Sequence, residues 1–369
     1  MAKITFYPLG NADSYLIQTD SNNYFLFDFA EMKNPDIIND KRISLGKSLK
    51  EDIGWPNRKY IDVLAISHGD NDHVKGISTN FHLEHAQKYQ GNDRIIINEL
   101  WVPAALIVEE GSEDDTRIIR QEARHRFLTE KKGIKVFARP EHLKDWLESN
   151  GKKFDDYRHL ICDAGKIVPG WTTTSKGIEF FVHAPFAEKT DDGLLERNDN
   201  SLVMQVSICS QGNITRLLAT GDSVCQQWEK IIQITRYFKN DSKLEWDILK
   251  IPHHCSYKAM STEKGSSTTE PSEEFQWLLD QGANRGILVS TSEEIPNSTS
   301  KQPPHVETYR RYEETANQLD ADLVVTMEHP NKLNPQRLII TIDSNGPTLK
   351  KTISSPSIIT TSQRAPRVG

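Results

Sequence analysis

The sequence predicts an α/β fold. Short apolar runs rich in β-branched residues indicate buried strands, and helix-type segments lie between them. The clearest strand-like runs are 61–67, 216–219 and 247–251, and each leads into a His or an Asp within a few residues. Side chains that follow strand ends collect on the loops at one edge of a sheet. The pattern therefore predicts a functional site built by those loops.

The remaining elements follow from the same periodicity and from turn and capping signals. Strands are expected at 3–7, 14–18, 24–29, 95–103, 133–137, 165–170, 177–183, 202–206, 286–290, 322–327 and 337–342. Helices are expected at 46–54, 76–90, 109–132, 140–150, 223–234, 275–282 and 306–319. The turn Asp20-Ser21-Asn22-Asn23 predicts that the second and third strands form a hairpin.

Length and charge limit the function classes. The chain has 369 residues, enough to bury a full core without disulfides. Its net charge of -7 argues against a broad basic surface for nucleic acid, but it is compatible with a small anionic substrate.

Cysteine spacing and hydropathy predict where in the cell the protein is located. The four cysteines form no C-x-x-C pair, which favours a reducing, cytoplasmic location. The first residues enter a strand pattern at once, without the apolar stretch of a leader. No apolar run approaches the roughly 20 residues that a membrane helix needs, so we expect no membrane partner.

The stretch after the strand at 61–67 carries the strongest chemical signal. His68, Asp70, Asp72 and His73 are candidate metal ligands within six residues. The intervening Gly and Asn tolerate the unusual backbone angles of a turn that curls around a cation. Imidazole and carboxylate together suit zinc, manganese or iron. The alternative is an ordinary polar turn.

This stretch resembles the first metal-binding motif of the metallo-β-lactamase fold, H-x-H-x-D-H, with Asp70 in place of the second His. With Val74-Lys75-Gly76 after it, it is similar to the soluble nuclease-like domain of the ComEC/Rec2 DNA-uptake proteins and their stand-alone relatives. Three later segments resemble that domain in the same order, although Cys255 replaces a Gly of the family. They are Asn198-Asp199-Asn200-Ser201-Leu202-Val203, Thr220-Gly221-Asp222 and His253-His254-Cys255-Ser256.

The resemblance implies a metallo-β-lactamase αββα sandwich, in which two mixed β-sheets carry helices on their outer faces. It implies one domain over 1–351, with an insertion at about 104–160. The residues after it, 352–369, are rich in Ser, Thr and Pro and are expected to form a flexible tail.

The resemblance also implies two divalent metal ions, zinc or manganese. Asp222 would bridge them. Asp72, His73 and one of His253 and His254 would complete one metal site. His68 and Asp70 would belong mainly to the other.

Several roles stay open at this level. We favour His253 as the ligand because it lies at the strand end, with His254 contacting substrate or acting as an acid, but the reverse is also open. His183 is either an extra ligand or structural. Asp28 either holds a ligand His or caps a turn. Asp72 is expected to orient the attacking water as well as to bind metal. The candidate substrate contacts are Asn198, Asn200 and Ser201.

The resemblance also implies hydrolysis by a hydroxide that two metal ions activate, since bound metals lower the pKa of water and offset developing charge. A phosphodiesterase or nuclease is favoured, with a phosphodiester substrate such as nucleic acid or a nucleotide. One alternative is an ester, thioester or amide hydrolase. Another is a non-catalytic subunit of a multi-protein complex in defence or DNA processing, with a protein partner at the insertion or tail.

Overall fold

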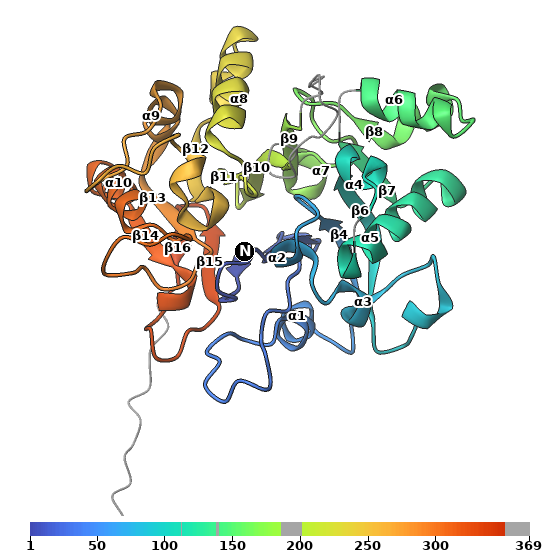
Figure 1. The fold of residues 1–369 in the computed structure, drawn as a ribbon, viewed down its shortest axis with the longest axis horizontal. Coiled ribbons are helices and arrows are strands. Elements are labelled where there is room, and N and C mark those ends of the chain that lie inside the picture. The colour runs from blue at the N-terminus through green and yellow to red at the C-terminus, as the bar shows by residue number, and fades with distance from the viewer. Residues whose placement is uncertain (112, 138–139, 186–200, 351–369) are drawn as a thin grey trace, which may run out of the picture.

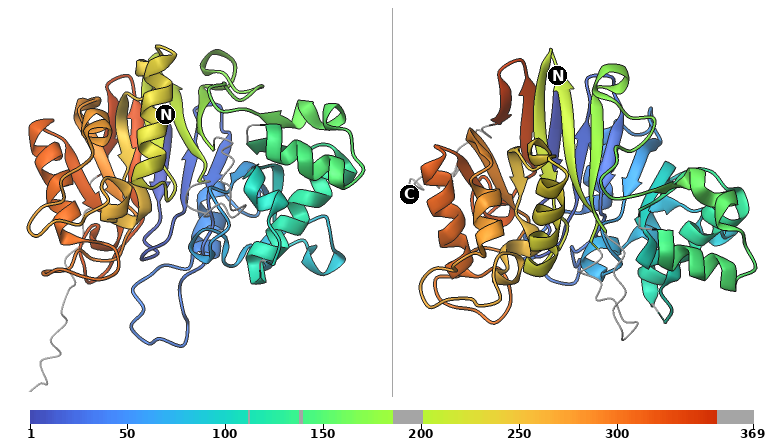
Figure 2. Two further views of the ribbon diagram at one scale, coloured as in Figure 1. Left: turned by 45° about the horizontal axis from the view of Figure 1, so that its top comes forward. Right: turned by 90° about the horizontal axis from the view of Figure 1, so that it is seen from above.

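Two mixed β-sheets pack face to face, and helices cover the outer face of each (Figure 1). The computed structural model describes residues 1–111, 113–137, 140–185 and 201–350. Figure 2 shows the helices of the first half on one side of the paired sheets and those of the second half on the other. The predicted αββα sandwich is confirmed.

The first sheet has ten strands in the order β16-β15-β1-β2-β3-β4-β6-β7-β8, with β5 paired to β6. The predicted hairpin at 20–23 joins β2 to β3, and the strands from β3 to β8 run parallel. The strands are β1 (Ala2–Phe6), β2 (Tyr15–Gln18), β3 (Tyr24–Phe27), β4 (Tyr60–Ala65), β5 (Phe81–His82), β6 (Ile95–Pro103), β7 (Ile134–Phe137), β8 (Ile161–Cys162), β15 (Leu338–Asp343) and β16 (Gly346–Leu349).

The second sheet has six strands in the order β14-β13-β12-β11-β10-β9. Strands β9 to β11 are antiparallel, and β11 to β14 are parallel. The strands are β9 (Ile178–Ala184), β10 (Val203–Ser210), β11 (Asn213–Ala219), β12 (Trp246–Lys250), β13 (Gly282–Ser290) and β14 (Asp322–Val325).

Three apolar layers hold these elements together, because successive side chains of a strand point to opposite faces. Val63 and Leu217 lie in the layer between the two sheets. Their neighbours Leu64 and Leu218 face outward into the layers under the helices. The α-helices are α1 (Leu45–Ile53), α2 (Asn71–Val74), α3 (Ile77–Asn80), α4 (Ala104–Val108), α5 (Asp114–Arg124), α6 (Pro140–Ser149), α7 (Thr173–Lys176), α8 (Cys225–Tyr237), α9 (Glu273–Leu279) and α10 (Val306–Gln318).

Shorter helical turns connect the elements. They are the 3-10 turns η1 (Gln87–Tyr89), η3 (Phe154–Leu160), η5 (Asp241–Lys243), η6 (Pro252–Cys255), η7 (Tyr257–Ala259) and η8 (Thr326–Glu328), and the π-helical turn η2 (His125–Glu130).

The helix predicted over 76–90 is wrong. Helix α3 ends after one turn, and Phe81 and His82 pair in parallel with Ile95 and Ile96 of β6. Phe81 is fully buried in this pairing, so tertiary packing overrides the local helix signal. The strand predicted over 165–170 is reduced to a single bridge between Ile167 and Phe181.

Residues 104–160 continue the first sheet. They contain α4 to α6 and β7, and Ile134 of β7 pairs in parallel with Leu100 of β6. That this segment is an insertion stays a prediction, and the predicted tail, 352–369, lies outside the described residues. All four cysteines are free thiols. Within the described ranges, no helix combines the length and the apolar character needed to cross a lipid bilayer.

Candidate metal centre

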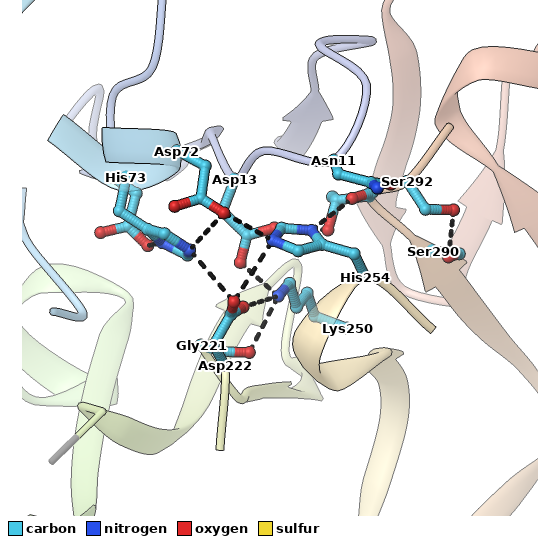
Figure 3. Close-up of polar contacts among 12 residues, drawn as sticks. Asn11, Asp13, Asp72, His73, Gly221, Asp222, Lys250, His254, Ser290 and Ser292 are labelled. Carbon is cyan, nitrogen blue, oxygen red and sulfur yellow. Dashed lines mark hydrogen bonds and ion pairs between the residues drawn. The ribbon is translucent and has the colours of Figure 1, made fainter. Parts of the chain in front are cut away.

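Three loops at the strand ends bring four side chains together (Figure 3). Asp72 and His73 lie on α2 after β4, Asp222 follows β11, and His254 lies on η6 after β12. Each offers one ligand atom, and these atoms all lie within 4.8 Å of one another. We call these four residues the metal cluster.

The contacts inside the metal cluster centre on one carboxylate oxygen. Oδ2 of Asp222 lies 3.5 Å from Nε2 of His73 and 3.3 Å from Nε2 of His254. Nε2 of His254 is also 3.3 Å from Oδ2 of Asp72. Three of the four side chains are buried, whereas Asp72 is 32% exposed and opens the cluster toward solvent.

In both histidines, the hydrogen bond of Nδ1 determines whether Nε2, which faces the cluster, has a free lone pair. Nδ1 of His73 lies 2.8 Å from Oδ2 of Asp28, and Nδ1 of His254 lies 2.7 Å from the carbonyl oxygen of Thr291. Both partners are acceptors, so each Nδ1 carries a proton and donates it. In the neutral ring, Nε2 then presents a lone pair to the cluster, as a metal ligand must.

The donor set of the metal cluster fits a divalent cation. Nε2 of His73 and Nε2 of His254 are buried without a hydrogen-bond partner among the described residues. Buried polar atoms without partners are rare in folded proteins and need an explanation. Two imidazoles and two carboxylates that converge on one point are the ligands that zinc and manganese accept.

The pKa shifts describe the same cluster without a cation. Burial lowers the pKa of His254, but the charge of Asp222 and contacts with both cluster carboxylates raise it to about 10. Burial raises the pKa of Asp222, but His254 and His73 lower it well below its ordinary value. Protons on the histidines thus balance the carboxylates, and a bound cation would replace those protons.

Asp28 connects the cluster to β4. Its Oδ1 accepts a hydrogen bond from the backbone N–H of Ser67 at 2.7 Å, and its Oδ2 accepts from the Ser67 hydroxyl at 2.7 Å. The same Oδ2 accepts from His73, so Asp28 orients that ring. The sequence left open whether Asp28 holds a ligand His or caps a turn. In the structure it holds the ring of His73, a candidate ligand.

His68 and Asp70 lie beside the metal cluster. Nε2 of His68 is 3.4 Å from Oδ2 of Asp70, and the ring centroids of His68 and His73 are 3.9 Å apart. Nε2 of His68 is buried and has no hydrogen-bond partner among the described residues.

His254, and not the favoured His253, contributes to the metal cluster. Residues 253–255 all adopt left-handed backbone angles, with φ between 52° and 63°. This rare conformation turns the chain sharply, and the rings of His253 and His254 lie at 85° to each other. Nδ1 of His253 is buried without a hydrogen-bond partner within the described part of the chain.

Of the two roles left open for His183, extra ligand or structural residue, its contacts favour the structural one. Its Nε2 lies 2.8 Å from the carbonyl oxygen of Lys243, and its Nδ1 lies 3.4 Å from the hydroxyl of Thr235. Burial lowers its pKa to about 4. Both ring nitrogens are engaged away from the metal cluster, so neither is available as a ligand.

The predicted substrate contacts are described only in part. Asn198 and Asn200 lie outside the described residues, whereas Ser201 is fully buried. Gly221 has φ +52°, and a Cβ there would lie 3.2 Å from Cβ of Ser201 and 3.1 Å from Cβ of Ser67. Gly before Asp222 therefore avoids both backbone strain and close contacts with Ser67 and Ser201.

Lys250 is a residue of the site that sequence reasoning missed. It is fully buried, forms an ion pair with Asp13 and lies 3.9 Å from Oδ1 of Asp222 (Figure 3). Its signal was a Lys within the apolar run Ile248-Leu249-Lys250-Ile251, where a charge must find a buried partner.

An acidic pocket of about 420 Å³ opens beside Asp72. It is lined by Asp70, Asn71, Asp72, Gly111, Glu113, Asp114 and Thr116. Its wall therefore carries negative charge next to the metal cluster.

No protein-family model and no curated protein matches the sequence. Among solved structures, unliganded PDE1 from yeast is 11% identical, with a TM-score of 0.43 over 88% of this chain and 96% of that chain. A diphosphatase from the PhnP family is 13% identical, with a TM-score of 0.33 over 88% of this chain and 95% of that chain. A metallo-β-lactamase from Elizabethkingia meningoseptica is 16% identical, with a TM-score of 0.32 over 75% of this chain and 88% of that chain. Similarities this low place the chain in no family, and the resemblance to ComEC/Rec2 domains stays a prediction.

Proposed function

We propose that this chain is a metal-dependent hydrolase. The observation that carries the proposal is the convergence of Asp72, His73, Asp222 and His254 within 4.8 Å. Both histidines donate from Nδ1 to outer acceptors, so their Nε2 atoms are available to a cation. Zinc and manganese are the ions that this donor set suits.

A divalent ion in the metal cluster would make hydroxide available near neutral pH and offset negative charge on the attacked group. The protein's own contribution is orientation and proton transfer. Asp72 is the exposed member of the cluster and lines the acidic pocket. We therefore assign to Asp72 the orientation of water that enters there and the acceptance of its proton. His73 and His254 donate from Nδ1 to outer acceptors, so their Nε2 atoms would bind the ion.

A second ion belongs to the same proposal. His68 and Asp70 would hold it beside the metal cluster, because their side chains are 3.4 Å apart. His253 would assist, since its Nδ1 is buried without a hydrogen-bond partner among the described residues.

We propose a short phosphodiester as the substrate. The ordered motifs resemble those of a nuclease-like domain, which favours attack at phosphorus. However, Asp70, Glu113 and Asp114 line the pocket beside the cluster. This negative wall would repel a long polyanion, so a nucleotide or the end of a strand fits better than duplex DNA.

The test compares substrates and variants. Wild-type protein is stripped with a chelator, reloaded with zinc or manganese, and given bis-p-nitrophenyl phosphate, a single-stranded oligonucleotide and a neutral nitrophenyl ester. We expect phosphodiester turnover that Asp222→Asn abolishes. The matched control is Asp247→Asn. The half-buried Asp247 carboxylate accepts a hydrogen bond from the backbone N–H of Arg216, away from the cluster.

Other outcomes would favour the alternatives. Turnover of the ester alone would support an ester, thioester or amide hydrolase. Stoichiometric metal without turnover on any substrate would support a non-catalytic subunit.

A further inference from the structure

A buried lysine lies next to the metal cluster. Lys250 is 0% exposed, and its Nζ forms an ion pair with Asp13, which is 1% exposed. Nζ also donates a hydrogen bond to the carbonyl oxygen of Gly221 at 3.0 Å. A buried ammonium is costly unless it is paired, so these contacts keep Nζ at one place.

Lys250 acts on the Asp222 carboxylate from the side away from the histidines. Its Nζ lies 3.9 Å from Oδ1 of Asp222, whereas Oδ2 faces His73 and His254 at 3.5 and 3.3 Å. It also holds the peptide that precedes Asp222 through the Gly221 carbonyl. Lys250 therefore contacts Asp222 and the peptide before it, while Oδ2 of Asp222 faces the two histidines (Figure 3).

Asp13 contacts the residues that hold His254 and Asp72. It accepts a hydrogen bond from the hydroxyl of Thr291, whose carbonyl oxygen accepts from Nδ1 of His254 at 2.7 Å. The backbone N–H of Asp13 donates to the carbonyl oxygen of Asp72 at 3.1 Å. Oδ1 of Asp13 also lies 3.7 Å from Nδ1 of His254, so Lys250 and Asp13 together contact all three loops that carry the cluster.

We infer that Lys250 and Asp13 are a positioning pair that holds Asp222 and His254 in ligand orientation before a cation arrives. The inference rests on the proposed metal site. A pair that served folding alone would affect stability and leave metal affinity unchanged.

The decisive variant is the double substitution Asp13→Asn with Lys250→Met. It removes one negative and one positive charge, so the net charge near the cluster, and with it the long-range attraction for a cation, is unchanged. Asn can still accept from Thr291, so the variant mainly removes the hold of Lys250 on Gly221 and Asp222. We expect zinc affinity, measured by competition with a chelating dye, to fall about tenfold or more.

Two comparisons separate positioning from folding. The double variant should keep a Tm close to that of the wild type, whereas Lys250→Met alone leaves Asp13 buried and unpaired and should unfold at a lower temperature. As a matched control, Arg58→Met with Asp62→Asn removes the ion pair at β4, whose side chains are 15% and 17% exposed. Zinc affinity should not change in that control.

The outcomes are distinguishable. If the wild type binds zinc and the folded double variant binds it equally well, the inference is overturned and the proposed function stands. If the wild type binds neither zinc nor manganese, both are overturned. Should the double variant not fold, Thr291→Val decides, because it removes the hydroxyl contact with Asp13 and keeps the carbonyl. A weaker zinc affinity supports the inference, and an unchanged one overturns it.

Discussion

Nδ1 of His73 lies 2.8 Å from Oδ2 of Asp28, and the two side chains are 0% and 2% exposed. An acceptor at this place directs the opposite nitrogen, Nε2, into the metal cluster. The short contact is possible because Asp28 follows β3 while His73 follows β4, and these strands are parallel neighbours. Asp28, which is not one of the four cluster residues, therefore orients the ring of a candidate ligand.

We predict that Asp28→Asn weakens metal binding by about 10- to 100-fold, because the uncharged amide is a poorer acceptor for the His73 ring. Isothermal titration with zinc measures the change. The control is Asp62→Asn, since Asp62 also accepts a backbone N–H, from Tyr24 at 2.7 Å, but lies on β4 away from the cluster. Equal affinities in the two variants would contradict the role of Asp28.

We predict that His254→Ala and His253→Ala differ. Nε2 of His254 lies within 3.3 Å of both Asp72 and Asp222, so its loss removes a ligand from the metal cluster. His253 lies outside that group of four. The stoichiometry and affinity of bound zinc should therefore fall more in the His254 variant. A larger loss on removing His253 would restore the assignment expected from the strand end.

We predict that Glu122→Gln lowers the free energy of unfolding by about 3 kcal/mol, because it leaves the buried Arg126 without its charged partner. Glu122 is fully buried, and its two oxygens contact Nε of Arg126 at 2.7 Å and Nδ1 of His85 at 2.8 Å. Burial raises the pKa of Glu122, but these partners lower it to about 2.

The control for that prediction is Glu110→Gln, at an ion pair with Arg124 whose Glu side chain is 77% exposed. Exposed pairs contribute little, so urea denaturation should show almost no change. Similar losses in both variants would mean that the contacts of Glu122 contribute no more than a surface pair.

We predict that His183 makes the protein less stable in acid. Its pKa is about 4 in the folded chain, against an ordinary value of 6.5. Between these values the unfolded chain binds a proton that the folded chain does not, so stability falls as the pH falls through this window. The loss between pH 7.5 and pH 5.0 should be roughly 2 kcal/mol.

His183→Gln tests this, because Gln can still donate to the Lys243 carbonyl but does not titrate. Urea denaturation of both proteins at pH 7.5 and pH 5.0, with chelator present, gives the four stabilities. The variant should lose less stability on acidification than the wild type. Parallel losses would show that His183 does not set this dependence.

The strands and the first half of the site are local properties of the sequence. The runs at 61–67 and 247–251 are short and apolar, with side chains in the layer between the two sheets and in the layers under the helices, and such a run indicates a buried strand without tertiary information. The group His68 to His73 is compact because its members are neighbours in the sequence. Asp222 and the pair His253-His254 were singled out because their motifs follow strands in a recognised order, but the order did not decide which His of the pair joins the cluster.

Tertiary structure decided the rest, because it depended on contacts between residues distant in sequence or on backbone angles that no local pattern specifies. The segment 81–82 is a strand because it pairs with Ile95 and Ile96 of β6. The fold brings His254, and not His253, into the group of four, and the backbone at 253–255 has left-handed angles that no local pattern specifies. Lys250 and Asp13 form an ion pair because the fold brings β12 next to the loop between β1 and β2. A buried charge on a strand indicates that a group of opposite charge lies nearby, but only the tertiary structure shows which residue it is.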